Sequence, residues 1–285
     1  MKRFTKIVLI LAAICFVLGN VIVGAATAMG GGISSVGKRQ ADIKDGIIQK
    51  IEAKENAGIE KKKEAAGGSE GNVSLSGENI RKVSVSVQAG AIRVITEADR
   101  DSVEIRDISE HMDVSKELDG DSLELDFRKK RGIDHLISDE KIHGIVVLPE
   151  NCEFQEIELE VDGGAVIVDE VIARKLKLEV EAGTAQVIKG SSDMLQIECA
   201  AGAVEYQGEV KELLDVETDA GAVKLHLEGR KEDYNYELNS SAGGIELDGE
   251  TFGGLNQKKI FSYEHAEKRA RLECSAGGIE VEFTN

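Results

Sequence analysis

Carboxylate side chains recur at one position of a repeated motif, and their type and spacing could support chemistry. Five glutamates stand four residues before a repeated glycine: Glu160, Glu179, Glu198, Glu217 and Glu273. Further acids stand two residues before it, at Asp162, Glu181 and Asp219. If the repeats stack as β-coils, the four successive glutamates Glu160, Glu179, Glu198 and Glu217 lie roughly 4.8 Å apart on an outward face. Such a row could bind Ca²⁺ or a cationic partner, because hard cations prefer carboxylate oxygens. The alternative is a solvated face, screened by salt and by interleaved Lys177 and Arg271.

No recognised catalytic motif accompanies these acids. The sequence lacks an Asp-x-Asp-x-Asp-Gly loop, a Gly-x-Ser-x-Gly elbow and a Walker pattern, and its five histidines show no zinc-type spacing. We interpret those histidines as surface or rim residues. A glycan-cleaving β-helix is the enzymatic alternative, but the chain has no tryptophan for a sugar platform and no acid pair stands out. We therefore expect no enzyme, no cofactor and no defined metal site.

The glycines belong to an internal repeat in which a small-Gly-small tripeptide leads into an alternating strand. It recurs as QAGAIRV, GGAVIV, EAGTAQV, AAGAVEY, DAGAVKL, SAGGIEL and SAGGIEV. The turn glycines are Gly90, Gly164, Gly183, Gly202, Gly221, Gly243 and Gly277. From Gly164 to Gly221 the spacing is a constant 19 residues, and a fixed period near 20 predicts a solenoid. Each glycine is expected to supply a positive φ or a corner too tight for a Cβ.

Apolar or small residues occupy five columns around each glycine: seven, five and three positions before it, and two and four after it. The column five before it reads Val85, Leu159, Leu178, Ile197, Val216, Leu238 and Leu272. This alternation places one edge of each coil inward, and neighbouring coils must stack to bury it. Cys199 and Cys274 fall in an inward column. With Cys152 they are the three cysteines beyond the N-terminal segment, an odd set that we interpret as core residues and not as a disulfide framework.

The expected fold class is therefore all-β, a β-solenoid or β-helix-like stack of two-strand repeats over residues 73–285. Residues 99–150 interrupt the repeat as a variant region or insertion, and Arg128–Gly132 within them resembles an exposed loop. The stretch Gly253–Arg271 is expected to form a long hairpin or loop.

The N-terminal part predicts a membrane segment followed by a stalk. Residues Ile7–Ala28 carry no charge, and this segment is long enough to span a bilayer. Three cations precede it. We expect residues 1–29 to anchor the chain with its C-terminal part outside, or to be a signal segment cleaved after Ala28. Residues 30–72 predict a solvated helical stalk and a Gly-rich linker, with a short coiled coil as the alternative.

The charge balance limits the classes of partner that the chain can bind. Beyond the three N-terminal cations, 32 Lys and Arg oppose 53 acids. Such a surface repels nucleic acid and anionic lipid, so a cell-wall component, a cation or another envelope protein is the expected partner.

The stretch Gly164–Gly278, with the preceding IVVLPENCEFQEIELEVDGG, resembles the bacterial putative-adhesin family of β-strand repeats, a domain of unknown function in cell-envelope proteins of Gram-positive bacteria. The resemblance covers about Val73–Phe283 and implies a solenoid-like fold, an envelope location and links to adhesion or to envelope-stress signalling. It carries over no catalytic residues. An adhesin-like binding module is the function that we expect first, and an extracytoplasmic regulatory or stress-sensing domain acting through a membrane partner is the alternative.

Overall fold

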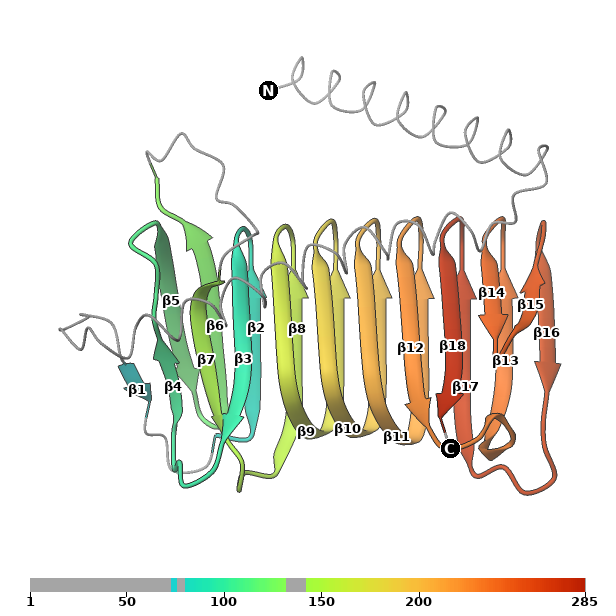
Figure 1. Cartoon of the computed structure of the whole chain (residues 1–285), viewed down its shortest axis with the longest axis horizontal. Helices are drawn as coiled ribbons and strands as arrows, with labels where there is room; N and C mark the ends of the chain where they lie inside the picture. Colours follow the sequence, from blue (N-terminus) through green and yellow to red (C-terminus); the bar gives the residue numbers. More distant parts are fainter. Residues whose placement is uncertain (1–72, 76–79, 132–141, 285) are drawn as a thin grey trace, which may run out of the picture.

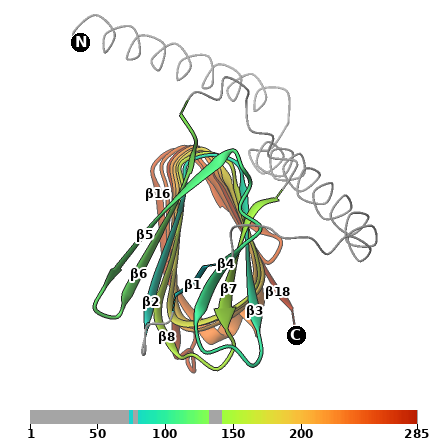
Figure 2. The same cartoon turned by 90° about the vertical axis from the view of Figure 1, so that its left-hand side faces the viewer.

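The computed structural model describes residues 73–75, 80–131 and 142–284. Its strands form one 18-stranded sheet. Figure 1 shows the strands side by side along a long axis, and the end-on view in Figure 2 shows the sheet folded into two facing walls. The expectation of an all-β, solenoid-like fold is confirmed.

Two sequence predictions fall outside these residues: the membrane segment of residues 1–29 and the stalk of residues 30–72. Within the described ranges, no helix is long and apolar enough to cross a membrane.

The two walls share three long strands that bend from one wall into the other. The first wall runs in the order β5 (Met112–Asp119), β6 (Ser122–Lys129), β2 (Lys82–Val87), β8 (Phe154–Val161), the second halves of β9 (Ala165–Val180), β10 (Thr184–Cys199) and β11 (Ala203–Thr218), then β17 (Lys268–Cys274), β13 (Tyr234–Ser240) and β16 (Gln257–Phe261). The second wall runs in the order β1 (Val73–Leu75), β4 (Val103–Arg106), β7 (Ile142–Pro149), β3 (Ala91–Glu97), the first halves of β9, β10 and β11, then β12 (Ala222–Glu228), β18 (Gly278–Thr284), β14 (Gly244–Leu247) and β15 (Glu250–Gly253). A short 3₁₀ helix, η1 (Lys231–Asp233), precedes β13.

Parallel, in-register pairing places like residues over like residues in the central coils. Leu176 pairs with Leu195, which pairs with Leu214, each one 19-residue repeat further along. Pairing becomes antiparallel at the ends of the stack, in β1–β4, β4–β7, β5–β6, β13–β16 and β14–β15. The repeat period thus fixes the register of the middle, and the irregular segments cap it.

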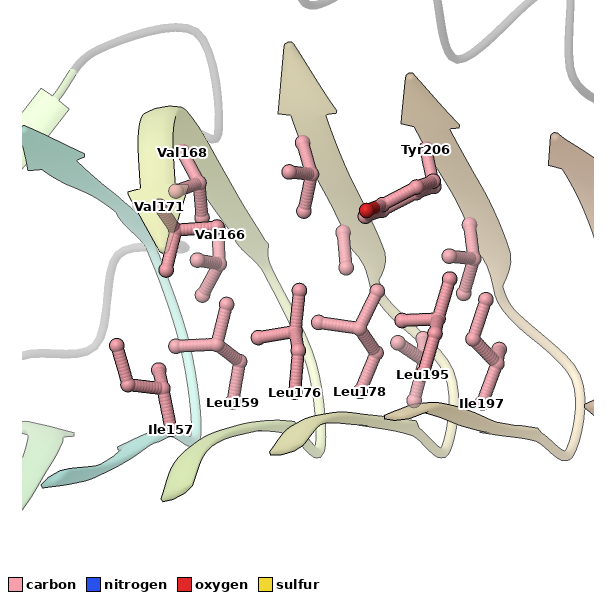
Figure 3. Packing of buried hydrophobic residues seen from close by; sticks show 14 of the residues in the cluster. Ile157, Leu159, Val166, Val168, Val171, Leu176, Leu178, Leu195, Ile197 and Tyr206 are labelled. Atoms are coloured by element: carbon pink, nitrogen blue, oxygen red, sulfur yellow. The ribbon is translucent and has the colours of Figure 1, made fainter. Parts of the chain in front are cut away.

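The core lies between the walls and includes the five predicted columns. Every residue of those columns is buried, and Figure 3 shows the aliphatic rows of three neighbouring coils meeting across the interior. Two buried polar side chains have partners: Thr218 Oγ1 donates to the Cys199 carbonyl at 3.0 Å, and the Tyr206 hydroxyl donates to the Glu209 carbonyl at 3.0 Å. Alternation on both walls therefore yields one continuous apolar interior.

The turn glycines stack on one another at the corner between the walls. Gly90 and Gly164 have positive φ values of 87° and 101°, whereas the five later glycines do not have positive φ. At these five positions space is the constraint: a Cβ on Gly202 would lie 2.3 Å from Val180 Cγ1 and 2.5 Å from the Gly183 carbonyl oxygen. The corner is tight because each coil follows the previous one at hydrogen-bond distance, with Ala203 N donating to the Gly183 carbonyl at 3.0 Å.

The coils do not stack entirely in sequence order. The last coil, β17–β18, inserts between the Gly221 coil and the Gly243 coil, because β17 pairs with β11 and β13, and β18 pairs with β12 and β14. The stretch Gly253–Arg271 contains the connection to it and the cap strand β16. At the other end, the insertion of residues 99–150 supplies the capping strands β4–β7.

Three sequence interpretations are corrected by the structure. Arg128 and Lys129 belong to strand β6 and not to a loop, because they pair with Asp113 and Met112 of β5. Cys152 is partly exposed, unlike the buried Cys199 and Cys274, since it lies in the turn after β7. His143 is buried, and its Nδ1 accepts a hydrogen bond from the Ala91 amide at 3.2 Å.

Candidate binding surface on the first wall

Strand register brings five glutamates of distant repeats into one row on the outer face of the first wall. Glu160 of β8 pairs with Glu179 of β9, which pairs with Glu198 of β10, then Glu217 of β11 and Glu273 of β17. We call these five residues the acidic ladder. Their side chains point outward because each stands between two buried residues of its strand.

The row continues on both sides of the acidic ladder. Ser86 of β2 lies beside Glu160 and also beside Asp126 of β6, and Asn239 of β13 lies beside Glu273. Asp126 was missed by the sequence reasoning because β6 has no turn glycine to align. The alternation of Leu123, Leu125 and Phe127 was the signal that could have placed it outward.

Like charges one strand spacing apart repel each other, and few cations offset them. Lys177 Nζ lies 2.7 Å from Glu179 Oε2 and 2.9 Å from Glu158 Oε1. At the far end, Arg271 lies 2.7 Å from Glu273. Glu198 accepts a hydrogen bond from Gln196 Nε2 at 2.8 Å. Among the residues that the structure describes, no cation therefore bonds directly to Glu198 in the middle of the ladder.

At the other end of the acidic ladder, the environment of Glu160 disfavours the ionised form of its carboxyl group. Burial raises the pKa of its carboxyl group above the ordinary value, and the negative charges of Asp162, Glu179 and Glu158 raise it further, while a hydrogen bond with Ser86 acts in the opposite direction. A cation bound here would relieve this unfavourable environment.

The centre of the ladder borders a shallow recess of about 190 Å³. Ala200 forms part of its lining. At the equivalent position of the neighbouring coils, two residues before the turn glycine, stand the acids Glu181 and Asp219. Glu181, Glu217 and Asp219 form no ion pair among the residues that the structure describes. Five carboxylates therefore contribute to the lining of this recess: Glu179, Glu181, Glu198, Glu217 and Asp219.

The adjacent outward column, six residues before each glycine, is an internal comparison. It reads Glu158, Lys177, Gln196, Asp215 and Arg271 along the same strands. Opposite charges meet there, as Lys177 does with Glu158 at 2.9 Å and Arg271 with Asp215 at 3.4 Å. A mixed-charge column is the composition that a merely solvated face needs, and the acidic ladder differs from it.

The described residues give little support for a metal site or a nucleophilic cysteine. Among residues 73–75, 80–131 and 142–284, no group of three or more His, Cys, Asp or Glu side chains is arranged to hold a metal ion. Burial raises the pKa of the Cys274 thiol to about 11, which is unfavourable for a nucleophile. His226 Nδ1 lies 3.1 Å from Glu282 on the second wall, far along the coil from the ladder.

The stacked coils, glycine corners and outward charged columns define a solenoid-like β-repeat domain. The family model described as Toastrack DUF4097 matches residues 69–282, and the chain belongs to this family. The resemblance to the bacterial putative-adhesin family of β-strand repeats is thereby confirmed. No curated protein matches the chain.

Several crystal structures are similar to this chain at low sequence identity. A "putative cell adhesion protein" from Clostridium sporogenes ATCC 15579 is 13% identical, with 75% of this chain and 98% of that chain covered and a TM-score of 0.43. A "putative adhesin" from Bacteroides fragilis NCTC 9343 is 10% identical, with 75% and 98% covered and a TM-score of 0.29. A "putative adhesin" from Parabacteroides merdae ATCC 43184 is 12% identical, with 75% and 95% covered and a TM-score of 0.31.

Proposed function

We propose that this protein is a non-enzymatic binding module of the cell envelope, displayed outside the membrane, whose acidic ladder binds a cationic partner. The observation that carries the proposal is the in-register row of Glu160, Glu179, Glu198, Glu217 and Glu273 beside a mixed-charge column on the same wall. Sequence supports the location, since the uncharged segment Ile7–Ala28 follows three cations.

The geometry favours a polymeric cation over a single ion. The carboxylates form a line and do not converge on one point, and five rungs span four strand spacings, roughly 19 Å. A basic peptide segment or an amino-substituted glycan could lie along such a row and exchange counterions over its whole length. A Ca²⁺ ion, in contrast, requires six to eight oxygens around one centre.

Binding of labelled oligolysine to the full chain tests this proposal. Fluorescence anisotropy should show saturable binding that weakens with salt. Affinity should rise with peptide length up to about six residues, the extended length that matches roughly 19 Å, and should rise more slowly beyond it.

A matched pair of triple variants separates the ladder from overall charge. Glu179→Gln, Glu198→Gln and Glu217→Gln together should weaken oligolysine binding about tenfold or more, because each lost pair with an ionised group contributes about 1.5–3 kcal/mol at best and less on an exposed face. The control variant removes three acids away from the first wall: Glu209→Gln, Glu212→Gln and Glu228→Gln. Equal losses in the two variants would show that net charge, and not the ladder, attracts the peptide.

A further inference from the structure

A cluster of cations at one end of the first wall contrasts with the acidity of the rest of the molecule. Arg128, Lys129, Lys130 and Arg131 are the longest unbroken run of Lys and Arg in a chain with 53 acids and 35 Lys and Arg. The run covers the last two residues of strand β6 and the two residues that follow it, and β6 lies at the left-hand end of the stack in Figure 1. Together with Gln88 and Ser115 it lines a groove of about 850 Å³. We call this site the basic groove.

Among the residues that the structure describes, cations outnumber acids at the basic groove. Arg128 Nε lies 2.9 Å from Asp126 Oδ2, and Asp113, also on the groove wall, is the strand partner of Arg128. Lys130 and Arg131 form no ion pair with any residue that the structure describes. Their main chain is nevertheless fixed at its start, since Lys130 N donates to the His111 carbonyl at 3.0 Å. Four cations therefore face two acids.

The groove also offers neutral donors beside the cations. Ser115 and Gln88 line it, and a hydroxyl or an amide can donate to an oxyanion. Arginine forks bind phosphate oxygens in bidentate fashion, and lysine supplies a mobile point charge. The volume of about 850 Å³ is much larger than one small anion needs, given that a water molecule occupies roughly 30 Å³.

We propose that the basic groove binds a linear phosphate polymer, a ligand opposite in charge to the partner of the acidic ladder. The acids along the middle of the first wall repel such a polymer, so that it binds at the β5–β6 end and not along the stack. The site is independent of the ladder, because it depends on other strands and on the opposite charge.

Fluorescence anisotropy of the full chain with a labelled short linear polyphosphate is the test. Binding should be saturable and should weaken as salt rises. The double variant Lys130→Gln with Arg131→Gln should weaken binding about tenfold or more, since two charge-assisted contacts are lost. The matched control, Lys258→Gln with Lys259→Gln on β16 at the other end of the stack, should change it about twofold or less.

A second variant, Ser115→Ala, keeps every charge and should weaken binding by a smaller factor of about two to five through one lost hydrogen bond. Circular dichroism should show unchanged strand content in each variant. No binding by the wild-type chain at low salt, or an equal loss in the β16 control, would overturn the proposal. Equal affinity for poly-glutamate would overturn the assignment to phosphate.

Two further outcomes distinguish this site from the ladder and from self-association. The ladder variant with Glu179→Gln, Glu198→Gln and Glu217→Gln should keep polyphosphate binding, even if it loses oligolysine. If the groove instead holds the acidic ladder of a second copy, sedimentation will show dimers that dissociate in the Lys130→Gln, Arg131→Gln variant, and polyphosphate will not bind; that result rejects the proposal.

Discussion

Substitution of one corner glycine, Gly202→Ala, should destabilise the whole stack. A Cβ at this position would lie 2.3 Å from Val180 Cγ1 and 2.5 Å from the Gly183 carbonyl oxygen, both closer than non-bonded atoms approach. The same carbonyl accepts the Ala203 amide at 3.0 Å. The new methyl group can fit only if the two coils separate at the corner, and separation lengthens that hydrogen bond.

The expected cost follows from these two contacts. Overpacking of a well-packed interior costs about 1–3 kcal/mol, and weakening of the corner hydrogen bond adds about 0.5–1.5 kcal/mol. The free energy of unfolding should therefore fall by about 2–4 kcal/mol. Left-handed strain adds nothing to this cost, because Gly202 does not have a positive φ.

Gly120→Ala is the comparison, because it isolates the backbone effect. Gly120 has φ +62° and no atom within 4 Å of an added Cβ, so its substitution should cost about 1 kcal/mol through left-handed strain alone. Urea unfolding followed by circular dichroism measures both variants, with slopes compared because repeat stacks can lose two-state behaviour. If Gly202→Ala costs less than Gly120→Ala, steric closeness between coils does not determine the corner residue.

Three further predictions concern charge and thiols. Glu217→Gln should raise the free energy of unfolding by about 0.2–1 kcal/mol, because it removes a like-charge contact. Urea titrations should show a smaller gain at about 1 M salt, where the screening length is only about 3 Å. A gain that salt does not change would contradict this origin. Glu160→Gln should stabilise the folded protein at neutral pH. The pKa of Glu160 is raised in the folded state, so its ionised form opposes folding. Melting curves should show this gain in stability disappearing as the pH falls below 4.5, the ordinary pKa of the group. With a disulfide-exchange reagent, Cys152 should react in the native protein, while the buried Cys199 and Cys274 should react after unfolding; fast native labelling of all three would show that the coils open readily.

The core and its corners were predictable because one short period constrains them many times. Strand alternation fixes which residues point inward, and the 19-residue spacing aligns Leu176 with Leu195 and Leu214. The row of glutamates followed from the same alignment. A register error of one residue would have turned every column outward, so the agreement of several repeats specifies the register strongly.

The order of the coils could not be obtained in this way. The repeats centred on Gly221, Gly243 and Gly277 present equivalent inward columns, so a permuted stack buries the same apolar surface as a sequential one. The choice depends on the connection between Gly243 and Gly277, which is long enough for the last coil to return between its predecessors. The basic groove was equally invisible, since the run Arg128–Arg131 resembled a loop until its pairing with β5 was known.

The stack separates stability from recognition by position within each coil. Inward columns and corner glycines maintain the fold, and each added coil contributes one residue to every outward column of the first wall. The length of a binding row is therefore set by the number of coils, while its charge can change at exposed positions with small effects on stability. On this wall the acidic ladder runs from β8 to β17, and the basic run lies at the end of β6. Under the two proposals, one domain holds two polymers of opposite charge at separate places, and substitutions should remove each site while leaving the other intact.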